Sequence, residues 1–269
     1  MYSLVDHLPA LVVALLLLGL GGAAMIAGRA WQRRGGRENA GQTLYATTAA
    51  LSLFTLLIGF TFSVALNRYD TRRELVVEET AACFSLWQRL QLQPAPYRAD
   101  MAATLKAYVD ARLAWATGGE ETDRERPGDA ASDALMEQMW NLARSAGGDG
   151  ARLRLMADSL SRVDDAAWRR EAMAREHIPL SVIDGLGLFL LLSAFSLGYS
   201  GTSDSGLARL PHAIFLLLAA GAIFLVLDLD RPRSGLVTVN QAPMRELAGF
   251  MARDMAADHT LQHRSGVAR

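Results

Sequence analysis

The sequence predicts an all-α integral membrane protein with four transmembrane helices and a helical extramembrane domain inserted between spans 2 and 3. Three observations predict this fold. The chain of 269 residues is 51% hydrophobic, and its apolar residues gather in four stretches long enough to cross a bilayer. The polar middle has apolar residues at helical spacing, and no alternating strand pattern occurs. Finally, no Gly or Pro separates the second stretch from the polar segment that follows it.

The four predicted spans are residues 8–28, 44–66, 179–201 and 210–227. Span 1 differs from a cleaved leader because residues 1–8 contain no Lys or Arg. Its second half, GLGGAAMIAG, consists of small residues, which favour close helix contacts but are also common in membrane helices. The predicted divisions are 1–66 (spans 1 and 2), 67–178 (the helical domain), 179–228 (spans 3 and 4) and 229–269 (a tail).

Span 2 is predicted to continue beyond the membrane as one long helix. Residues 44–66 carry no charge, and the polar segment that follows stays periodic to Gln93. About 50 helical residues would measure roughly 75 Å, whereas the hydrocarbon core is about 30 Å thick. Such a helix would connect a membrane site to an aqueous domain.

The rest of the helical domain is predicted from breaks and periodicity. Pro94 and Pro96 end the long helix, and helices are expected at 97–116, near 131–145 and at about 151–177. The charged, Gly-rich tract 117–133 is expected to be a loop. These helices should pack as a bundle around the extension of span 2. After span 4, the tail is expected to contain only a short amphipathic stretch.

Composition and motifs exclude several classes of function. The net charge of −1 argues against a nucleic-acid partner. Cys83 is the only cysteine, so the chain has no intrachain disulfide and no cysteine-based zinc cluster, and we expect a packed, inert thiol. The sequence contains no G-x-S-x-G, H-E-x-x-H or P-loop motif. We therefore predict no enzyme activity, no catalytic residues, no cofactor and no metal site.

A stripe of small and hydroxyl side chains runs along span 2. Its members are spaced by four, three, four and four residues, so they share one side of a helix: Thr48, Ser52, Thr55, Gly59 and Ser63. Leu56 and Phe60 border this stripe. It predicts either the wall of an axial pore built from several copies of the helix, or a surface for tight helix packing.

Two short motifs resemble those of a known family. The segment LIGFTFSVALNRYDTRRELVVEE (57–79) resembles the second membrane helix of bacterial bestrophin-like proteins, and the end of span 4, LDLDRPRSGLVTV (227–239), resembles their closing motif. The matching residues of the first motif are Ile58, Gly59, Phe60, Arg68, Tyr69, Asp70 and Arg72. The resemblance covers the four-span plan and these two motifs.

The resemblance implies an ion channel that conducts small inorganic ions, with five copies of the chain around a central path. In that family the second membrane helix lines an apolar neck, which on this sequence corresponds to Ser52, Leu56 and Phe60. Apolar rings gate by dewetting, although Ser52 departs from the usual apolar residue. Charges at the neck exit would come from Arg68, Asp70 and Arg72.

The calcium clasp of the animal proteins is absent from this sequence. After the last span, only Asp228 and Asp230 stand at the corresponding place, and we expect them to pair with Arg231 or Arg233 at the membrane exit. The sequence therefore gives no support for gating by calcium.

The predicted location is the cytoplasmic (inner) membrane, with the lipid bilayer and further copies of the chain as partners. The short basic loop 29–42 favours the cytoplasm, which would place the helical domain outside, whereas the resemblance implies a cytosolic domain. The alternative function is a non-conducting scaffold or regulator whose helical domain binds partners. A stripe that faces a symmetry axis favours the channel, and a stripe packed on span 1 or 3 favours the scaffold.

Overall fold

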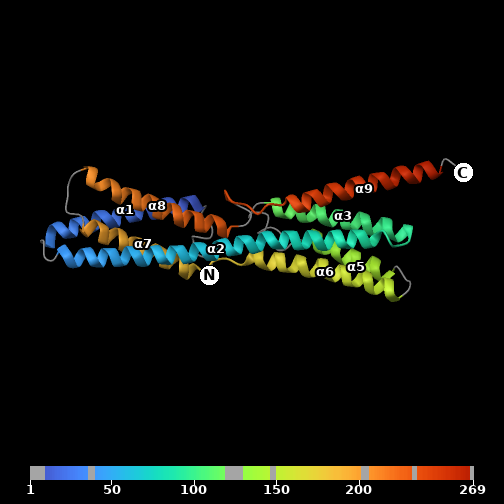
Figure 1. The fold of residues 1–269 in the computed structure, drawn as a ribbon, viewed down its shortest axis with the longest axis horizontal. Helices are drawn as coiled ribbons and strands as arrows, with labels where there is room; N and C mark the ends of the chain where they lie inside the picture. The colour runs from blue at the N-terminus through green and yellow to red at the C-terminus, as the bar shows by residue number, and fades with distance from the viewer. Residues whose placement is uncertain are drawn as a thin grey trace. The chain divides into compact units, whose positions relative to one another are not determined.

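A computed structural model describes residues 10–35, 40–118, 130–145, 150–200, 206–231 and 235–266. Regular structure in these ranges is helical throughout, and four helices are long and apolar enough to cross a membrane, as predicted (Figure 1). In chain order the helices are α1 (Ala10–Gly35), α2 (Ala40–Leu90), α3 (Ala95–Thr117), α5 (Ala130–Ser145), α6 (Gly150–Arg175), α7 (Leu180–Ser200), α8 (Gly206–Asp230) and α9 (Ala242–Gly266).

The chain divides into two compact units, and α2 contributes to both. Unit 1 consists of Met1–Tyr69, His177–Arg231 and Gly235–Val237, whereas unit 2 consists of Asp70–Glu176, Pro232–Ser234 and Thr238–Arg269. The 51 residues of α2 form one uninterrupted helix, as the absence of Gly and Pro after Phe60 predicts.

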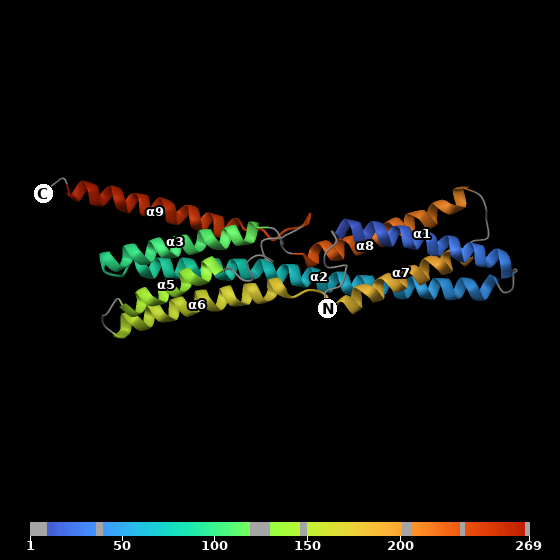
Figure 2. The ribbon, with the colours of Figure 1, turned by 180° about the vertical axis from the view of Figure 1, so that it is seen from behind.

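In unit 1, helices α1, α7 and α8 share a buried cluster with the first half of α2, which is light blue in Figure 2. The contact between α1 and α7 depends on glycines, because a Cβ at Gly198 would lie 2.0 Å from the Met25 carbonyl oxygen, and one at Gly28 would lie 2.2 Å from the Phe195 oxygen. By contrast, a Cβ at Gly22 would meet no atom within 4 Å. The small residues of span 1 therefore include one that lets two helix backbones touch.

The core of unit 1 joins α2 to the other spans. Phe54 on α2 is 3% exposed and meets the ring of Phe215 on α8 edge-on, with centroids 6.0 Å apart. Leu190 of α7 and Ile223 of α8 are buried in the same cluster. One side of span 2 is thus fixed against its own chain.

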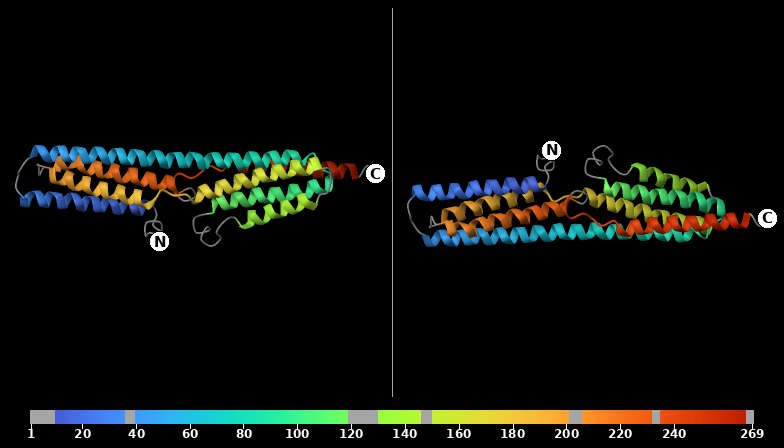
Figure 3. Two further views of the ribbon diagram at one scale, coloured as in Figure 1. Left: turned by 90° about the horizontal axis from the view of Figure 1, so that it is seen from below. Right: turned by 90° about the horizontal axis from the view of Figure 1, so that it is seen from above.

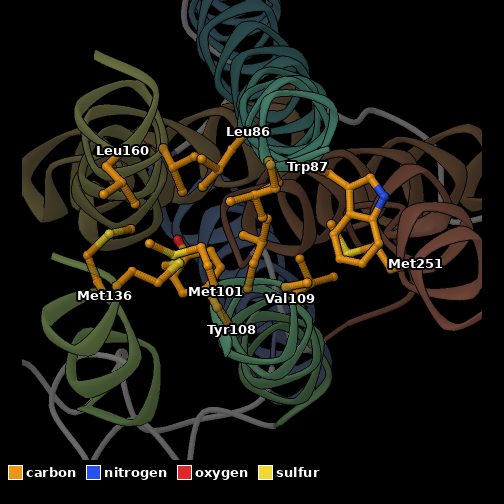
Figure 4. Close-up of a cluster of buried hydrophobic side chains, with 14 of the residues drawn as sticks. Leu86, Trp87, Met101, Tyr108, Val109, Met136, Leu160 and Met251 are labelled. Atoms are coloured by element: carbon orange, nitrogen blue, oxygen red, sulfur yellow. The ribbon is translucent and has the colours of Figure 1, made fainter. Parts of the chain in front are cut away.

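In unit 2, helices α3, α5, α6 and α9 form a bundle with the second half of α2, and α2 lies along one side of this bundle instead of at its centre (Figure 3). Figure 4 shows its core between the helices, with Leu86 and Trp87 on α2, Tyr108 on α3 and Leu160 on α6. The predicted break after α2 is confirmed, because Pro94 is extended (φ −57°, ψ 145°) and α3 begins at Ala95.

The expectation of only a short amphipathic stretch in the tail is wrong, because α9 contains 25 residues. Its apolar side enters the core of unit 2, where Met244 and Met251 are 0% exposed. The Asp254 carboxylate also accepts a hydrogen bond of 3.0 Å from Nε1 of Trp87 on α2. Burial and this bond stabilise a helix that weak periodicity alone would not predict.

Candidate functional site

The stripe of small residues lies in unit 1, on the side of α2 that faces away from the core of that unit. The buried side of α2 is formed by Thr47, Phe54, Thr61 and Ala65, each at most 4% exposed. At about 100° per residue, the centre of the stripe lies about 135° around the helix from these residues. All seven predicted stripe and neck residues are exposed: Thr48, Ser52, Thr55, Leu56, Gly59, Phe60 and Ser63.

A shallow, open hollow of about 770 Å³ follows the stripe, and its lining comes from α2 alone. Leu56 and Phe60 are 56% and 63% exposed, and a Cβ at Gly59 would meet nothing within 4 Å. The Thr55 hydroxyl donates to the Leu51 carbonyl oxygen at 2.8 Å and so remains within its own helix. In the described part of unit 1, the stripe therefore does not pack on α1 or α7, which are spans 1 and 3. Packing on either of these helices would have favoured the scaffold.

Arg72, one of the three predicted exit charges, is buried in unit 2. It is 4% exposed, and its Nη2 and Nε donate to the carbonyl oxygens of Glu176 (2.6 Å) and Met173 (3.3 Å). These oxygens belong to the C-terminal end of α6, where a cation also interacts favourably with the helix dipole. Within unit 2, the Arg72 guanidinium therefore stabilises a helix end.

The other two exit charges differ in their surroundings. Nη1 of Arg68 lies 3.8 Å from Oδ1 of Asp230, so its charge is partly neutralised within unit 1. Asp70, at the start of unit 2, is exposed. Of the three predicted residues, Asp70 is the one whose charge is most open to solvent.

Asp228, in the closing motif, holds a tight turn. The residue is 2% exposed, and its carboxylate accepts hydrogen bonds from the backbone amides of Leu236 (2.9 and 3.1 Å) and Val237 (2.9 Å). The turn requires Gly235, which has φ +136°, and a Cβ there would lie 2.4 Å from Oδ1 of Asp228.

Asp230 anchors the entry to α7. Both of its carboxylate oxygens lie 3.1 Å from the backbone amide of Ile178, which donates to them. The sequence predicted a pairing of the two aspartates with Arg231 or Arg233. The structure shows hydrogen bonds from backbone amides to both aspartates and an ion pair between Asp230 and Arg68. The pairing with Arg231 or Arg233 stays a prediction, and Arg233 lies outside the described residues.

A buried charge cluster in unit 2 fixes the second half of α2. Glu79 is 0% exposed, and its carboxylate accepts hydrogen bonds from Tyr108 Oη (2.9 Å), Arg112 Nε (2.6 Å) and Arg170 Nη1 (2.7 Å). Arg112 also donates to Glu171 at 2.7 Å. One carboxylate thus links α2 to α3 and α6.

Trp115 and Gln241 complete the cluster. The guanidinium carbons of Arg112 and Arg170 lie 4.6 and 5.3 Å from the centroid of the Trp115 ring, a cation–π arrangement. Nη2 of Arg170 donates to Oε1 of Gln241 at 2.7 Å, which joins the segment before α9 to the other helices.

Glu79 and Arg112 stabilise each other's charged forms, whereas burial, together with the like charge of Arg112, lowers the pKa of Arg170. Burial by itself would raise the pKa of Glu79, but Arg112 and Arg170 outweigh burial and lower it. Burial would lower the pKa of Arg112, but the adjacent Glu79 raises it. Burial, followed by the nearby charge of Glu79, raises the pKa of Cys83 well above its ordinary value of 9.0. Glu79 and Arg112 are therefore charged at neutral pH, and the Cys83 thiol is protonated.

Sequence reasoning missed this cluster, although a signal for it exists. Glu79 is spaced from the buried residues Val76, Cys83 and Leu86 by three, four and seven residues, so it lies on the core side of α2. A carboxylate at such a position requires a cationic partner. The sequence alone does not identify which of its many arginines supplies it.

Comparisons with known proteins agree on one family. Residues 10–244 match the family model of the bestrophin-like domain. The chain is also similar to crystal structures of a bacterial bestrophin homologue from Klebsiella pneumoniae. One, phased with zinc, has 15% identity and a TM-score of 0.65 over 89% of this chain and 94% of that one. A variant of that homologue has 14% identity and a TM-score of 0.67 over 91% and 96%. No curated protein sequence matches the chain.

Proposed function

The chain belongs to the bestrophin-like family, whose members are ion channels, and from this premise we propose that several copies of it form an ion channel lined by α2. The observation that carries the proposal is the uncovered stripe. An otherwise apolar membrane helix exposes small and hydroxyl side chains on one side, while its opposite side is buried in its own unit. A surface of this kind suits a symmetry axis with a path for small inorganic ions.

The neck of this path would consist of rings of Leu56 and Phe60, with Ser52 one turn before them. Both apolar side chains are more than half exposed and border the hollow, so they are available to face an axis. Closely spaced apolar rings exclude water, and a small rotation of α2 would then change conduction. At the exit we propose a ring of Asp70, because Arg72 is buried and Arg68 lies beside Asp230.

Residues 67–178 would form a helical domain outside the bilayer, inserted between spans 2 and 3. The proposal is supported by the division of the chain near Tyr69 and His177 and by the continuity of α2 across the first of these boundaries. The family resemblance suggests five copies in a cytoplasmic membrane with this domain in the cytosol. An image of the detergent-solubilised particle with a rotational symmetry other than five would contradict that number.

Ion flux in liposomes tests the proposal. Phe60→Ala should raise flux above that of the wild type, because it removes the bulkiest side chains of the proposed neck and so widens its opening. Phe62→Ala is the matched control, because it makes the same substitution two residues later, about 200° around the helix, where Phe62 packs against the buried cluster that contains Ala65. Flux from the wild type and the Phe60 variant that equals that of protein-free vesicles would refute the channel.

A further inference from the structure

A groove in unit 2 lies between α2 and α9. It is open, has a volume of about 640 Å³, and its lining includes Val77 and Phe84 from α2 and Phe250 from α9. These three side chains are 50%, 38% and 39% exposed, and the rings of Phe84 and Phe250 meet edge-on at 5.7 Å. The groove thus offers an apolar surface lined with aromatic rings to a further side chain.

Two arginines of α9, Arg245 and Arg253, also line this groove. Both are exposed, and neither forms an ion pair with a described residue of the chain. Glu246 is the acidic residue among the lining residues. The groove therefore combines an apolar floor with an excess of one positive charge, which favours an occupant that is both apolar and acidic.

The outer side of α6 carries a side chain of that kind. Trp168 is 72% exposed, and the nearby Asp164 and Asp165 are also exposed. The described residues supply no ion-pair partner to either aspartate, whereas the adjacent Arg169 pairs with Glu78 at 3.1 Å. Partial burial, together with Asp165 and Asp133, raises the pKa of Asp164, so a cation would be favourable there.

The two surfaces lie on opposite sides of α2. Figure 4 shows Leu160 of α6 on one side of Leu86 and Trp87, and Met251 of α9 on the other. Trp168 is not among the residues that line the groove, so it does not fill the groove of its own chain. Complementary surfaces on two different sides of one chain produce head-to-tail contacts, which form a closed ring when the rotation from one copy to the next closes.

We propose that Trp168 of one copy inserts between α2 and α9 of the next copy, with Asp164 and Asp165 facing Arg245 and Arg253. The proposal rests on the assembly of several copies in the proposed channel, and it identifies the surfaces that join them. Tryptophan and arginine are the residues that most often dominate the free energy of such contacts. A tryptophan side chain also supplies a large apolar area for burial in the groove.

Disulfide trapping in the full-length protein tests the contact. The double variant Trp168→Cys, Phe250→Cys should give a ladder of covalent products larger than a dimer under mild oxidation, because each copy is linked to two neighbours. Trp168→Cys alone can link at most two copies and is the control, and the native Cys83 is fully buried. A second control, Trp168→Cys with Glu137→Cys, places the partner cysteine on α5 and should give no ladder.

Charge reversal provides an independent test that does not require cysteines. Arg253→Glu should weaken assembly by about tenfold, and adding Asp165→Arg should restore it, because the two charges are exchanged across the contact. Light scattering of the detergent-solubilised protein measures the assembly. Failure of the second substitution to restore assembly would count against the contact.

The results of these tests distinguish failure of the proposed contact from failure of the proposed channel. A ladder without ion flux would support the contact and argue against conduction. The absence of a ladder from an assembly of unchanged size would overturn the contact, leave the channel intact and assign the groove to a different occupant.

Discussion

Replacement of Glu79 by glutamine should destabilise the protein far more than the same replacement at the preceding residue, Glu78. Glu79→Gln keeps the size of the side chain but removes the charge that contacts Arg112 and Arg170 at 2.6 and 2.7 Å. Loss of one partner from a buried ion pair costs about 3–5 kcal/mol, because the other charges stay buried without compensation. At about 2–4 °C per kcal/mol, the unfolding midpoint should fall by roughly 6–20 °C.

Glu78→Gln is the matched control, because it changes the adjacent residue of the same helix. Glu78 pairs with Arg169 at 3.1 Å, as Glu79 pairs with Arg170, but the side chains of the control pair are 49% and 59% exposed. Exposed pairs contribute about 0–1 kcal/mol, so the midpoint should change by no more than a few degrees. Thermal unfolding in detergent, followed by tryptophan fluorescence, measures both. Similar losses in the two variants would refute the account of the cluster.

The effect should also depend on pH. Because the arginines lower the pKa of Glu79 in the folded protein below its ordinary value of 4.5, its stabilising contribution is complete above about pH 4.5. The contribution is lost as the pH falls through the lowered folded pKa, where the wild-type carboxylate becomes neutral like glutamine. The difference in unfolding midpoint between the wild type and Glu79→Gln should therefore shrink in acid. A constant difference down to pH 2 would contradict the assignment.

The remaining predictions concern a thiol and three glycines. Cys83 is 0% exposed and has a raised pKa, so it should resist a maleimide at pH 8 until the protein is unfolded; rapid labelling of the native protein would refute this. Gly198→Ala should cost about 1–3 kcal/mol by forcing α1 and α7 apart, whereas Gly22→Ala, with open space around it, should stay within about 0.5 kcal/mol of the wild type in unfolding experiments. Gly235→Ala should cost about 1–3 kcal/mol, because φ is +136° and the new methyl group would meet Asp228; an unchanged midpoint would show that the turn is not rigid.

The sequence predicted what depends on local pattern. The four spans follow from apolar stretches, the end of α2 follows from Pro94 and Pro96, and the sharing of one helix side by Thr48, Ser52 and Ser63 follows from spacing alone. Spacing does not indicate what that side contacts. The structure adds that the described helices of unit 1 leave the stripe exposed.

Features that depend on tertiary contacts were not predicted. The partners of Glu79 come from α3 and α6, 33 and 91 residues away in the sequence, so their identity depends on how three helices pack. The role of Asp228 depends on the positive φ of Gly235, which presents two backbone amides to one carboxylate. The tail helix α9 is longer than predicted, because its stability comes from burial of Met244 and Met251 rather than from a strong pattern of its own.

Chemical modification of the stripe during flux measurements tests the central claim, that α2 lines an ion path, most directly. Ser52→Cys and Ala50→Cys place single thiols about 160° apart on the helix, at an exposed position of the stripe and at a partly buried position, and the native Cys83 is buried. A charged, thiol-specific reagent should sharply reduce flux through the Ser52 variant and leave flux through the Ala50 variant nearly unchanged. Equal effects on both variants, or no effect on either while flux persists, would contradict the claim.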